Sequence, residues 1–282
     1  MADRGAPSAL RFLVGNELRL AREAARMKQA AAAKAMGCSA GKLTYWESGR
    51  NRQQEDVVRS LLGLYRVPAP DIERIVRLAH QSDDGDWWAP YSDVVPDWMR
   101  TRVGLEALAC TEFVYEDKLI NGLLQTKAYA TALLDNNLKV PIGDVDRVVE
   151  LRMARQDLLT DPARLQVHVV MEEAVLLRPV GGSGVFAEQL HRVLELAERD
   201  NITVQVIPFE VPVHDGLDGR FTLLHFNEAQ GIGYIESPDG ARYVQEVDQV
   251  QAYDKRATRI ATGALGEAAS RKLIARHLAA HD

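Results

Sequence analysis

Cysteine is almost absent from this sequence: its 282 residues include only Cys38 and Cys110, which lie far apart. Two isolated cysteines cannot build the disulfide framework of a small secreted domain, and they lack the paired spacing of a zinc site. We therefore expect two reduced, structural thiols and no metal centre.

Long hydrophobic runs are also absent. No window approaches the roughly 18 uninterrupted apolar residues that a membrane-spanning helix requires. The segment Met1–Arg11 has neither an apolar core nor the small-residue cleavage site of a secretory signal. We expect a cytoplasmic protein with no membrane partner.

The charge of the chain is unevenly distributed. Its formal net charge is -6, yet residues 1–80 hold 14 Lys and Arg against 8 Asp and Glu, whereas residues 81–282 hold 20 against 32. A small basic segment joined to a larger acidic one is typical of a phosphate-binding module carried by a domain with a different task. The length of the chain allows two such domains.

Five helices are predicted before residue 82. Apolar residues at helical spacing, with breaks at glycine and proline, indicate helices over residues 10–25, 29–36, 40–47, 54–65 and 71–81. Gly37 can adopt the left-handed conformation of a tight turn, and Ser39 is placed to cap the third helix. This order of helix, glycine turn and capped helix is the one that places its second helix in the major groove of DNA.

Further residues strengthen this prediction. The stretch Gln29–Ser39 is followed by Leu43, Trp46 and the run Glu47–Arg50. In this pattern the chain resembles the XRE-type repressors of the lambda and Cro kind. The resemblance implies that Leu43 and Trp46 lie in the core, and that Arg22 of the first helix forms a buried ion pair with Glu47.

The residues that would contact DNA follow from helix geometry. If Leu43 and Trp46 point inward, the remaining positions of the helix face the groove. The resemblance implies that Gln29 binds the DNA backbone, and the residues after the helix are expected to reach phosphates. The candidate DNA-binding residues are Gln29, Ser39, Ala40, Gly41, Lys42, Thr44, Tyr45, Arg50, Asn51 and Arg52.

Two features depart from the XRE pattern. Ala40 and Gly41 stand where such repressors often carry hydrogen-bonding side chains, so base readout is expected to depend on Lys42, Thr44 and Tyr45. Arg26 stands where a glycine is common after the first helix. An alternative interpretation is a small alanine-rich bundle without a role on DNA, whose basic residues are a solvated face.

The acidic segment 82–86 predicts a linker, so the expected domains are 1–81 and 87–282. Trp87, Trp88, Tyr91 and Trp98 follow the linker, and a packing anchor is favoured over a contact surface. The second domain is predicted to be α+β with a mixed sheet. Its expected strands are 112–115, 165–171, 203–207, 221–225 and 233–236, and its expected helices are 100–109, 125–134, 145–159, 187–198 and two more from about 247 and 265.

The helix expected over 145–159 carries an apolar stripe that leaves Arg152, Arg155 and Gln156 off it. Other segments that stand out in this domain are Trp87-Trp88, Gly122–Thr126 with Tyr129-Ala130, Leu151–Gln156, Glu172–Ala174 with Arg178–Gly182, Gln189-Leu190, Val204–Pro208, Gly219–Leu223 and Tyr234–Glu236. In these segments the domain resembles the uncharacterised C-terminal domain that follows an XRE-type head in actinobacterial regulators, some described as antitoxin-like or developmental. Asn121 stands where those proteins usually have proline.

No catalytic constellation is evident. Six histidines, at 168, 191, 214, 225, 277 and 281, show no pair at metal-ligand spacing. The run Gly181–Gly184 precedes a helix but lacks the lysine of a phosphate loop, and Glu172 and Glu173 have no partner acid that the sequence places opposite them. We expect no catalytic residues, no cofactor and no metal.

These observations together predict a sequence-specific transcription regulator that binds double-stranded DNA as a homodimer on a palindromic operator. The resemblance of the second domain implies a regulator encoded beside a small partner protein. The alternative function is therefore an antitoxin-like module that neutralises such a partner and regulates its own expression. An enzyme with a DNA-binding head is a third hypothesis, and it would need catalytic residues that the sequence does not show.

Overall fold

The computed structural model describes residues 8–80, 88–91, 93–95, 97–135, 140–238 and 240–281. These residues form two compact units. The first contains the chain up to Ala109 together with His225–Ile232 and Gln245–Val247, and the second contains Cys110–Leu224, Gly233–Val244 and the chain from Asp248 onward. The predicted linker 82–86 lies outside the described residues.

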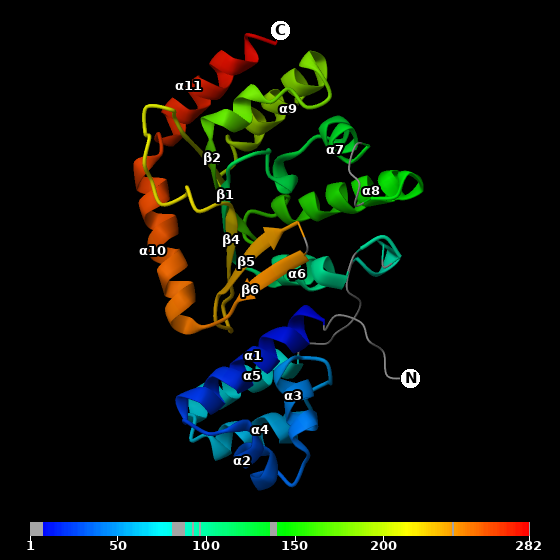
Figure 1. The fold of residues 1–282 in the computed structure, drawn as a ribbon, viewed down its shortest axis with the longest axis vertical. Coiled ribbons are helices and arrows are strands. Elements are labelled where there is room, and N and C mark those ends of the chain that lie inside the picture. The colour runs from blue at the N-terminus through cyan, green and yellow to red at the C-terminus, as the bar shows by residue number, and fades with distance from the viewer. Residues whose placement is uncertain are drawn as a thin grey trace. The chain divides into compact units, whose positions relative to one another are not determined.

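The first unit is mainly helical, and Figure 1 shows its helices α1 to α5 in blue and cyan. Its helices are α1 (Ala9–Ala24), α2 (Gln29–Ala35), α3 (Ala40–Glu47), α4 (Glu55–Leu64), α5 (Ala69–His80) and α6 (Asp97–Leu108), with a 3-10 turn η1 (Ala89–Tyr91). The prediction of five helices before residue 82 is confirmed, with ends that differ by one or two residues. Of the predicted aromatic cluster, Trp88 and Tyr91 are half-buried, whereas Trp87 lies outside the described residues.

Local chemistry explains why these helices begin and end where they do. The Ser8 and Ser39 side chains accept hydrogen bonds from the backbone N–H groups of Arg11 and Lys42, and so cap α1 and α3. Gly37 has a φ of 63°, which turns the chain between α2 and α3 at no steric cost. Arg26 has a φ of 54° at the turn after α1, a conformation that disfavours a residue with a Cβ atom.

A close approach of α1 to α3 positions the second helix of the motif. A Cβ atom on Gly15 would lie 2.6 Å from the Glu47 carbonyl oxygen, so only glycine allows this contact. Leu18 and Leu43 are fully buried in the core that the two helices share with α4 and α5. The orientation of α3 is therefore fixed by packing along one whole side.

The second unit is built on a six-stranded sheet in the order β3-β2-β1-β4-β5-β6. Its strands are β1 (Thr111–Glu116), β2 (Gln166–Glu172), β3 (Ile202–Ile207), β4 (Phe221–His225), β5 (Ile232–Ser237) and β6 (Gly240–Val244). Strands β1, β2 and β3 are parallel, with Val114 beside Val169 and Val169 beside Val204, whereas β5 and β6 are antiparallel. The predicted α+β class with a mixed sheet is confirmed, and β6 is a strand that the sequence did not indicate.

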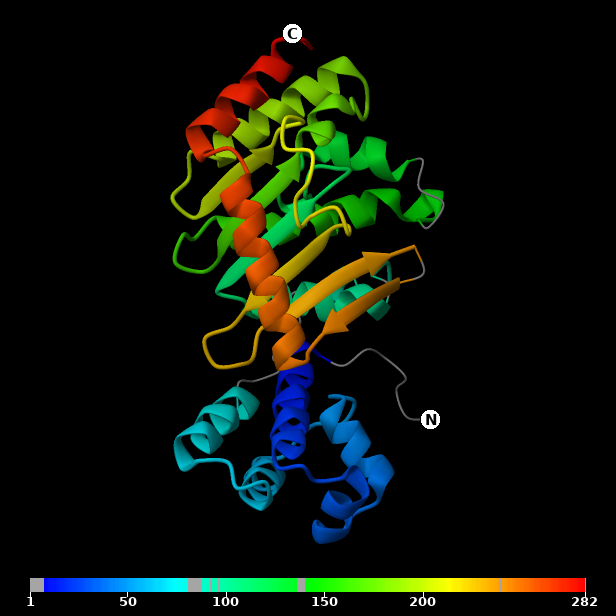
Figure 2. The ribbon, with the colours of Figure 1, turned by 60° about the vertical axis from the view of Figure 1, so that its left-hand side comes forward.

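Helices cover this sheet. They are α7 (Lys127–Leu134), α8 (Val145–Arg155), α9 (Ser183–Leu196), α10 (Val247–Gly263) and α11 (Glu267–Leu278), with 3-10 turns η2 (Gly122–Leu124), η3 (Ile142–Asp144), η4 (Gln156–Leu159) and η5 (Glu173–Leu177). Figure 2 shows α10 in orange lying across the strands, where Ile260 packs against Tyr115 and Phe221. The helix predicted over 145–159 ends at Arg155 and continues as η4.

Candidate nucleic-acid interface

One side of α3 is buried and the other is open to solvent. Leu43 is fully buried and Trp46 is 6% exposed, as the XRE resemblance implies for the inward side. All five residues that were expected to face a groove, Ala40, Gly41, Lys42, Thr44 and Tyr45, are exposed. Helical geometry places Gly41 and Tyr45 farthest from the core, with Lys42 and Thr44 flanking them.

The polar groups on this open side differ in the contacts that they already make within the protein. The Lys42 ammonium lies 4.9 Å from the centroid of the Trp46 ring, a cation–π contact. The Thr44 hydroxyl donates to the Ala40 carbonyl at 2.9 Å, which leaves its oxygen free to accept. Tyr45 is 45% exposed, and the described residues give its hydroxyl no hydrogen bond. Tyr45 therefore presents the most accessible hydrogen-bonding group at the centre of this side.

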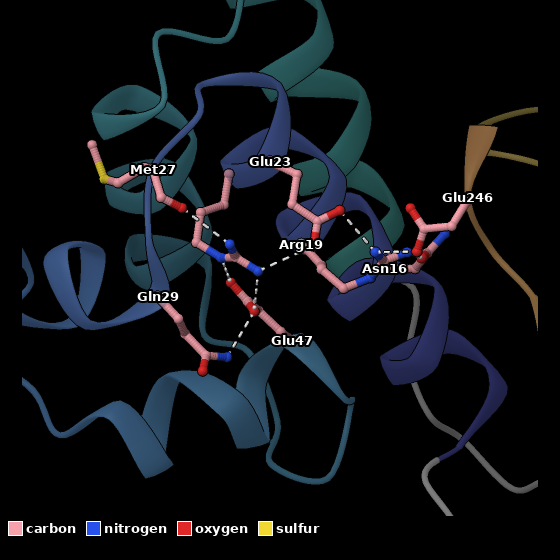
Figure 3. Close-up of polar contacts among 8 residues, drawn as sticks. Asn16, Arg19, Glu23, Met27, Gln29, Glu47 and Glu246 are labelled. Carbon is pink, nitrogen blue, oxygen red and sulfur yellow. Dashed lines mark hydrogen bonds and ion pairs between the residues drawn. The ribbon is translucent and has the colours of Figure 1, made fainter. Parts of the chain in front are cut away.

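A buried ion pair fixes the end of α3, as Figure 3 shows. Arg22 donates from Nε to Glu47 Oε1 at 2.6 Å and from Nη2 to Oε2 at 3.0 Å. The two side chains are 11% and 5% exposed. The hydrogen bond to Glu47 raises the pKa of Arg22 above its usual value, so the guanidinium is charged at any physiological pH. The two residues that the XRE resemblance pairs are therefore in contact.

Gln29 belongs to the same network. Its Nε2 donates to Glu47 Oε2 at 3.0 Å, so the side chain links the start of α2 to the end of α3. One hydrogen of this amide nitrogen is used in that bond and the other is available to a phosphate oxygen. Gln29 is half-buried, in contrast to the other candidate DNA-binding residues, which are all exposed.

The basic segment after α3 is held in place by a residue that sequence reasoning missed. Gln53 is 4% exposed, and its Nε2 donates to the carbonyls of Arg11 at 3.1 Å and Trp46 at 2.6 Å. Its neighbours Arg50, Asn51 and Arg52 are exposed. No local signal separates Gln53 from Gln54, because its burial depends on α1, which lies about forty residues away in sequence.

The first unit also contains ion pairs between its helices and segments that follow far later in the chain. Glu17 on α1 accepts from Arg74 Nη2 at 2.9 Å and from the backbone N–H of Gln230 at 2.6 Å. Arg19 pairs with Glu246 at 2.6 Å, as Figure 3 also shows. Residues more than two hundred positions away therefore complete the surroundings of α1.

Comparison with known families agrees with this geometry. Residues 13–75 match a family described as a helix-turn-helix domain. Residues 99–276, more than half of the chain, match a family described as a domain of unknown function, DUF5753. The chain belongs to the DUF5753 family. No curated protein and no solved structure matches the chain. The helix-turn-helix match indicates a DNA-binding regulator, and the DUF5753 match assigns no activity to the rest of the chain.

The residues of the DUF5753 region that were considered for catalysis make structural contacts. Glu172 accepts a hydrogen bond from Tyr115 and lies 3.1 Å from His214. Glu173 lies 3.0 Å from His277 and accepts from the backbone N–H of Phe209. Within the described part of the chain, no group of three His, Cys, Asp or Glu side chains is arranged to hold a metal ion, and no helix is long and apolar enough to cross a membrane.

Proposed function

We propose that the protein is a sequence-specific regulator of the XRE type, which binds operator DNA through the exposed side of α3. The observation that carries this proposal is that Gly41, Lys42, Thr44 and Tyr45 are presented on a helix whose opposite side is held by the Arg22–Glu47 pair. A rigid helix with an open polar side can enter a major groove without reorganisation.

Readout in this proposal depends on few side chains. Gly41 permits close approach of the helix backbone to the bases, and Tyr45 and Lys42 supply the hydrogen-bonding groups. Lys42 must leave the Trp46 ring to reach a base, so part of its binding free energy replaces an existing contact. Arg50, Asn51 and Arg52 then bind phosphates and set the register of the helix.

Fluorescence anisotropy with an operator mapped from genomic binding tests the proposal. Lys42→Ala and Tyr45→Ala are each expected to weaken specific binding by about 1 to 3 kcal/mol while leaving binding to random DNA nearly unchanged. Lys255→Ala, which removes an exposed lysine of α10, is the matched control and is expected to change neither affinity. Unchanged operator affinity in both α3 variants would show that this side of α3 does not read the bases.

The proposal includes a homodimer on a palindromic operator, because one helix-turn-helix unit contacts too little DNA for tight binding. Sedimentation of the free protein and of its complex gives the number of chains directly. A complex of one chain on a complete operator, with the affinity of the half-site alone, would contradict the dimer.

A small partner protein is the second candidate, in which DNA binding serves autoregulation. The second unit supports it because four large apolar side chains, Leu177, Phe209, Val213 and Leu217, are between 55% and 80% exposed. Large exposed apolar side chains are available for contacts with a partner protein. Stoichiometric copurification of the product of an adjacent gene, lost in Phe209→Ser, would favour this function.

A further inference from the structure

A cluster of buried polar groups lies where β1 ends in the second unit. Glu116 is the last residue of β1 and is 8% exposed. The loop that follows is pinned by side-chain amides: Gln125 donates to the Ile120 carbonyl at 2.6 Å, and Gln156 donates to the Gln125 carbonyl at 2.6 Å. The carboxyl ends of parallel strands are where open α/β sheets bind ligands.

Glu116 is only partly satisfied by the protein. Its Oε1 accepts from Asn121 at 3.3 Å, but its Oε2 has no hydrogen-bond partner among the described residues. The nearest cation is Arg220, 3.9 Å away, which is itself paired with Glu236 at 3.2 Å. Burial raises the pKa of Glu116 to about 7. A buried carboxyl oxygen that accepts no hydrogen bond lowers the stability of the fold unless another group binds it.

Arg152 on α8 is the complementary group. Its Nη1 donates to Gln125 Oε1 at 2.7 Å, and no carboxylate pairs with it among the described residues. Burial, together with repulsion from the nearby Arg155, lowers the pKa of Arg152 to about 10. Most N–H donors of this guanidinium are therefore not used by the described part of the protein, and its surroundings disfavour its positive charge. A bound anion would accept from these donors and would stabilise the charge.

Tyr129 supplies a third group beside Arg152, a phenol whose hydrogen is not donated to any acceptor in the described part of the chain. Its side chain is fully buried, and its O–H has no acceptor among the described residues. The cluster is not sealed, because Arg152, Gln156 and Arg220 are partly exposed to solvent. A guanidinium with spare donors and a phenol O–H that lacks an acceptor, together with a carboxyl oxygen that lacks a donor, would be complemented by one kind of ligand.

We propose that Glu116, Tyr129 and Arg152 form a binding site for a small organic anion, whose carboxylate or phosphate group also neighbours a hydrogen-bond donor. The anionic group binds the Arg152 guanidinium and accepts from the Tyr129 hydroxyl, and the donor group binds Glu116 Oε2. The acidic balance of this part of the chain favours a small anion over the backbone of a nucleic acid, which would be repelled.

The segments that meet here strengthen the proposal. Apart from Glu116 and Asn121, the polar residues of the site and its rim come from Gly122–Thr126, Tyr129, Leu151–Gln156, Gly219–Leu223 and Tyr234–Glu236. All five are among the segments in which the sequence resembles the C-terminal domain of actinobacterial regulators. Several motifs of this domain therefore meet at one place in its fold, whereas others, such as Val204–Pro208 at the end of β3, lie elsewhere.

Thermal unfolding of the full-length protein without DNA tests the site independently of the proposed DNA binding. Inorganic phosphate and acetate are titrated in separate arms at constant ionic strength. We expect a saturable rise in Tm in at least one arm, and the arm that gives it identifies the anionic group. Arg152→Gln is expected to abolish the rise, whereas Arg164→Gln, which removes an exposed arginine of the same unit, keeps it.

A second variant guards against misfolding. Tyr129→Phe removes only the hydroxyl from a buried ring and is expected to weaken the saturating response several-fold while the Tm without ligand changes little. Without ligand, Arg152→Gln is expected to keep the far-UV circular dichroism of the parent protein, because it also removes the repulsion from Arg155. The proposal is overturned if neither anion stabilises the protein beyond chloride, or if Tyr129→Phe and Arg152→Gln respond as the parent does.

Discussion

The Arg22–Glu47 pair offers the sharpest test of what fixes the position of α3. In Arg22→Met the aliphatic part of the side chain is retained, but Glu47 loses two of its three hydrogen bonds and keeps only the one from Gln29. Glu47 is 5% exposed, so water cannot replace the lost donors. Removing one partner of such a buried pair costs about 3 to 5 kcal/mol. We expect about 3 kcal/mol here, because the Gln29 hydrogen bond survives.

Urea unfolding, combined with hydrogen exchange of the α1 and α3 amides, measures this loss within the first unit. The double variant Arg22→Met/Glu47→Leu is expected to regain most of the stability, because both charges are then absent. Arg59→Met is the control, since Arg59 pairs with Glu73 on the surface and its loss is expected to matter far less. High salt is expected to abolish the small loss of stability in Arg59→Met and to leave the loss in Arg22→Met unchanged.

Two results would refute this reasoning. If Arg22→Met lowered the free energy of unfolding by less than about 1 kcal/mol, the pair would behave as an exposed one. If the double variant were as unstable as Arg22→Met alone, the loss would come from packing of the arginine side chain and not from an unpaired carboxylate.

Three further predictions concern other positions. Arg52→Ala is expected to weaken binding to all DNA sequences alike and to reduce the slope of log affinity against log salt by about one unit, whereas an unchanged slope would mean that Arg52 does not reach a phosphate. Arg26→Gly is expected to raise the free energy of unfolding by up to about 1 kcal/mol, because Arg26 has a φ of 54°. Ala21→Gly, within α1, is the control and is expected to lower it. Glu116 has a folded-state pKa of about 7, above the unfolded value near 4.5, so the free energy of unfolding is expected to fall by about 3 kcal/mol as the pH rises through this interval. Glu116→Gln should remove that fall and stabilise the protein at about pH 8 more than at about pH 5, and equal effects at both would contradict the assignment.

The helix-turn-helix was predictable because its signals are local. Gly37 and Ser39 define a turn and a cap within three residues, and both act in the structure as their chemistry indicates. The XRE resemblance implied the inward positions of Leu43 and Trp46, and both side chains are buried. The parallel strands β1, β2 and β3 were also found, because buried parallel strands carry β-branched runs that need no partner to be recognised.

The remaining features depend on contacts between residues far apart in sequence. Arg155 lies off the apolar stripe of its helix, yet it is 8% exposed because the Gly122 turn packs beside its guanidinium. Gln53 is buried against the backbone of α1, and strand β6 exists through its pairing with β5. Propensity cannot indicate such positions, since tertiary contacts decide them.

The contacts of Glu17 with Gln230 and of Arg19 with Glu246 bear on how this protein can be dissected. A fragment that stops after α5 would retain every residue of α3. It would leave the Glu17 carboxylate, which is 8% exposed in the full chain, without the hydrogen bond from the Gln230 backbone N–H. Chimeras that join another helix-turn-helix segment to the rest of this chain must therefore keep matching acidic and basic residues at positions 17, 19 and 246. The helix-turn-helix segment of this chain is not freely exchangeable, and exchanges that ignore these three positions should express poorly for reasons unrelated to DNA recognition.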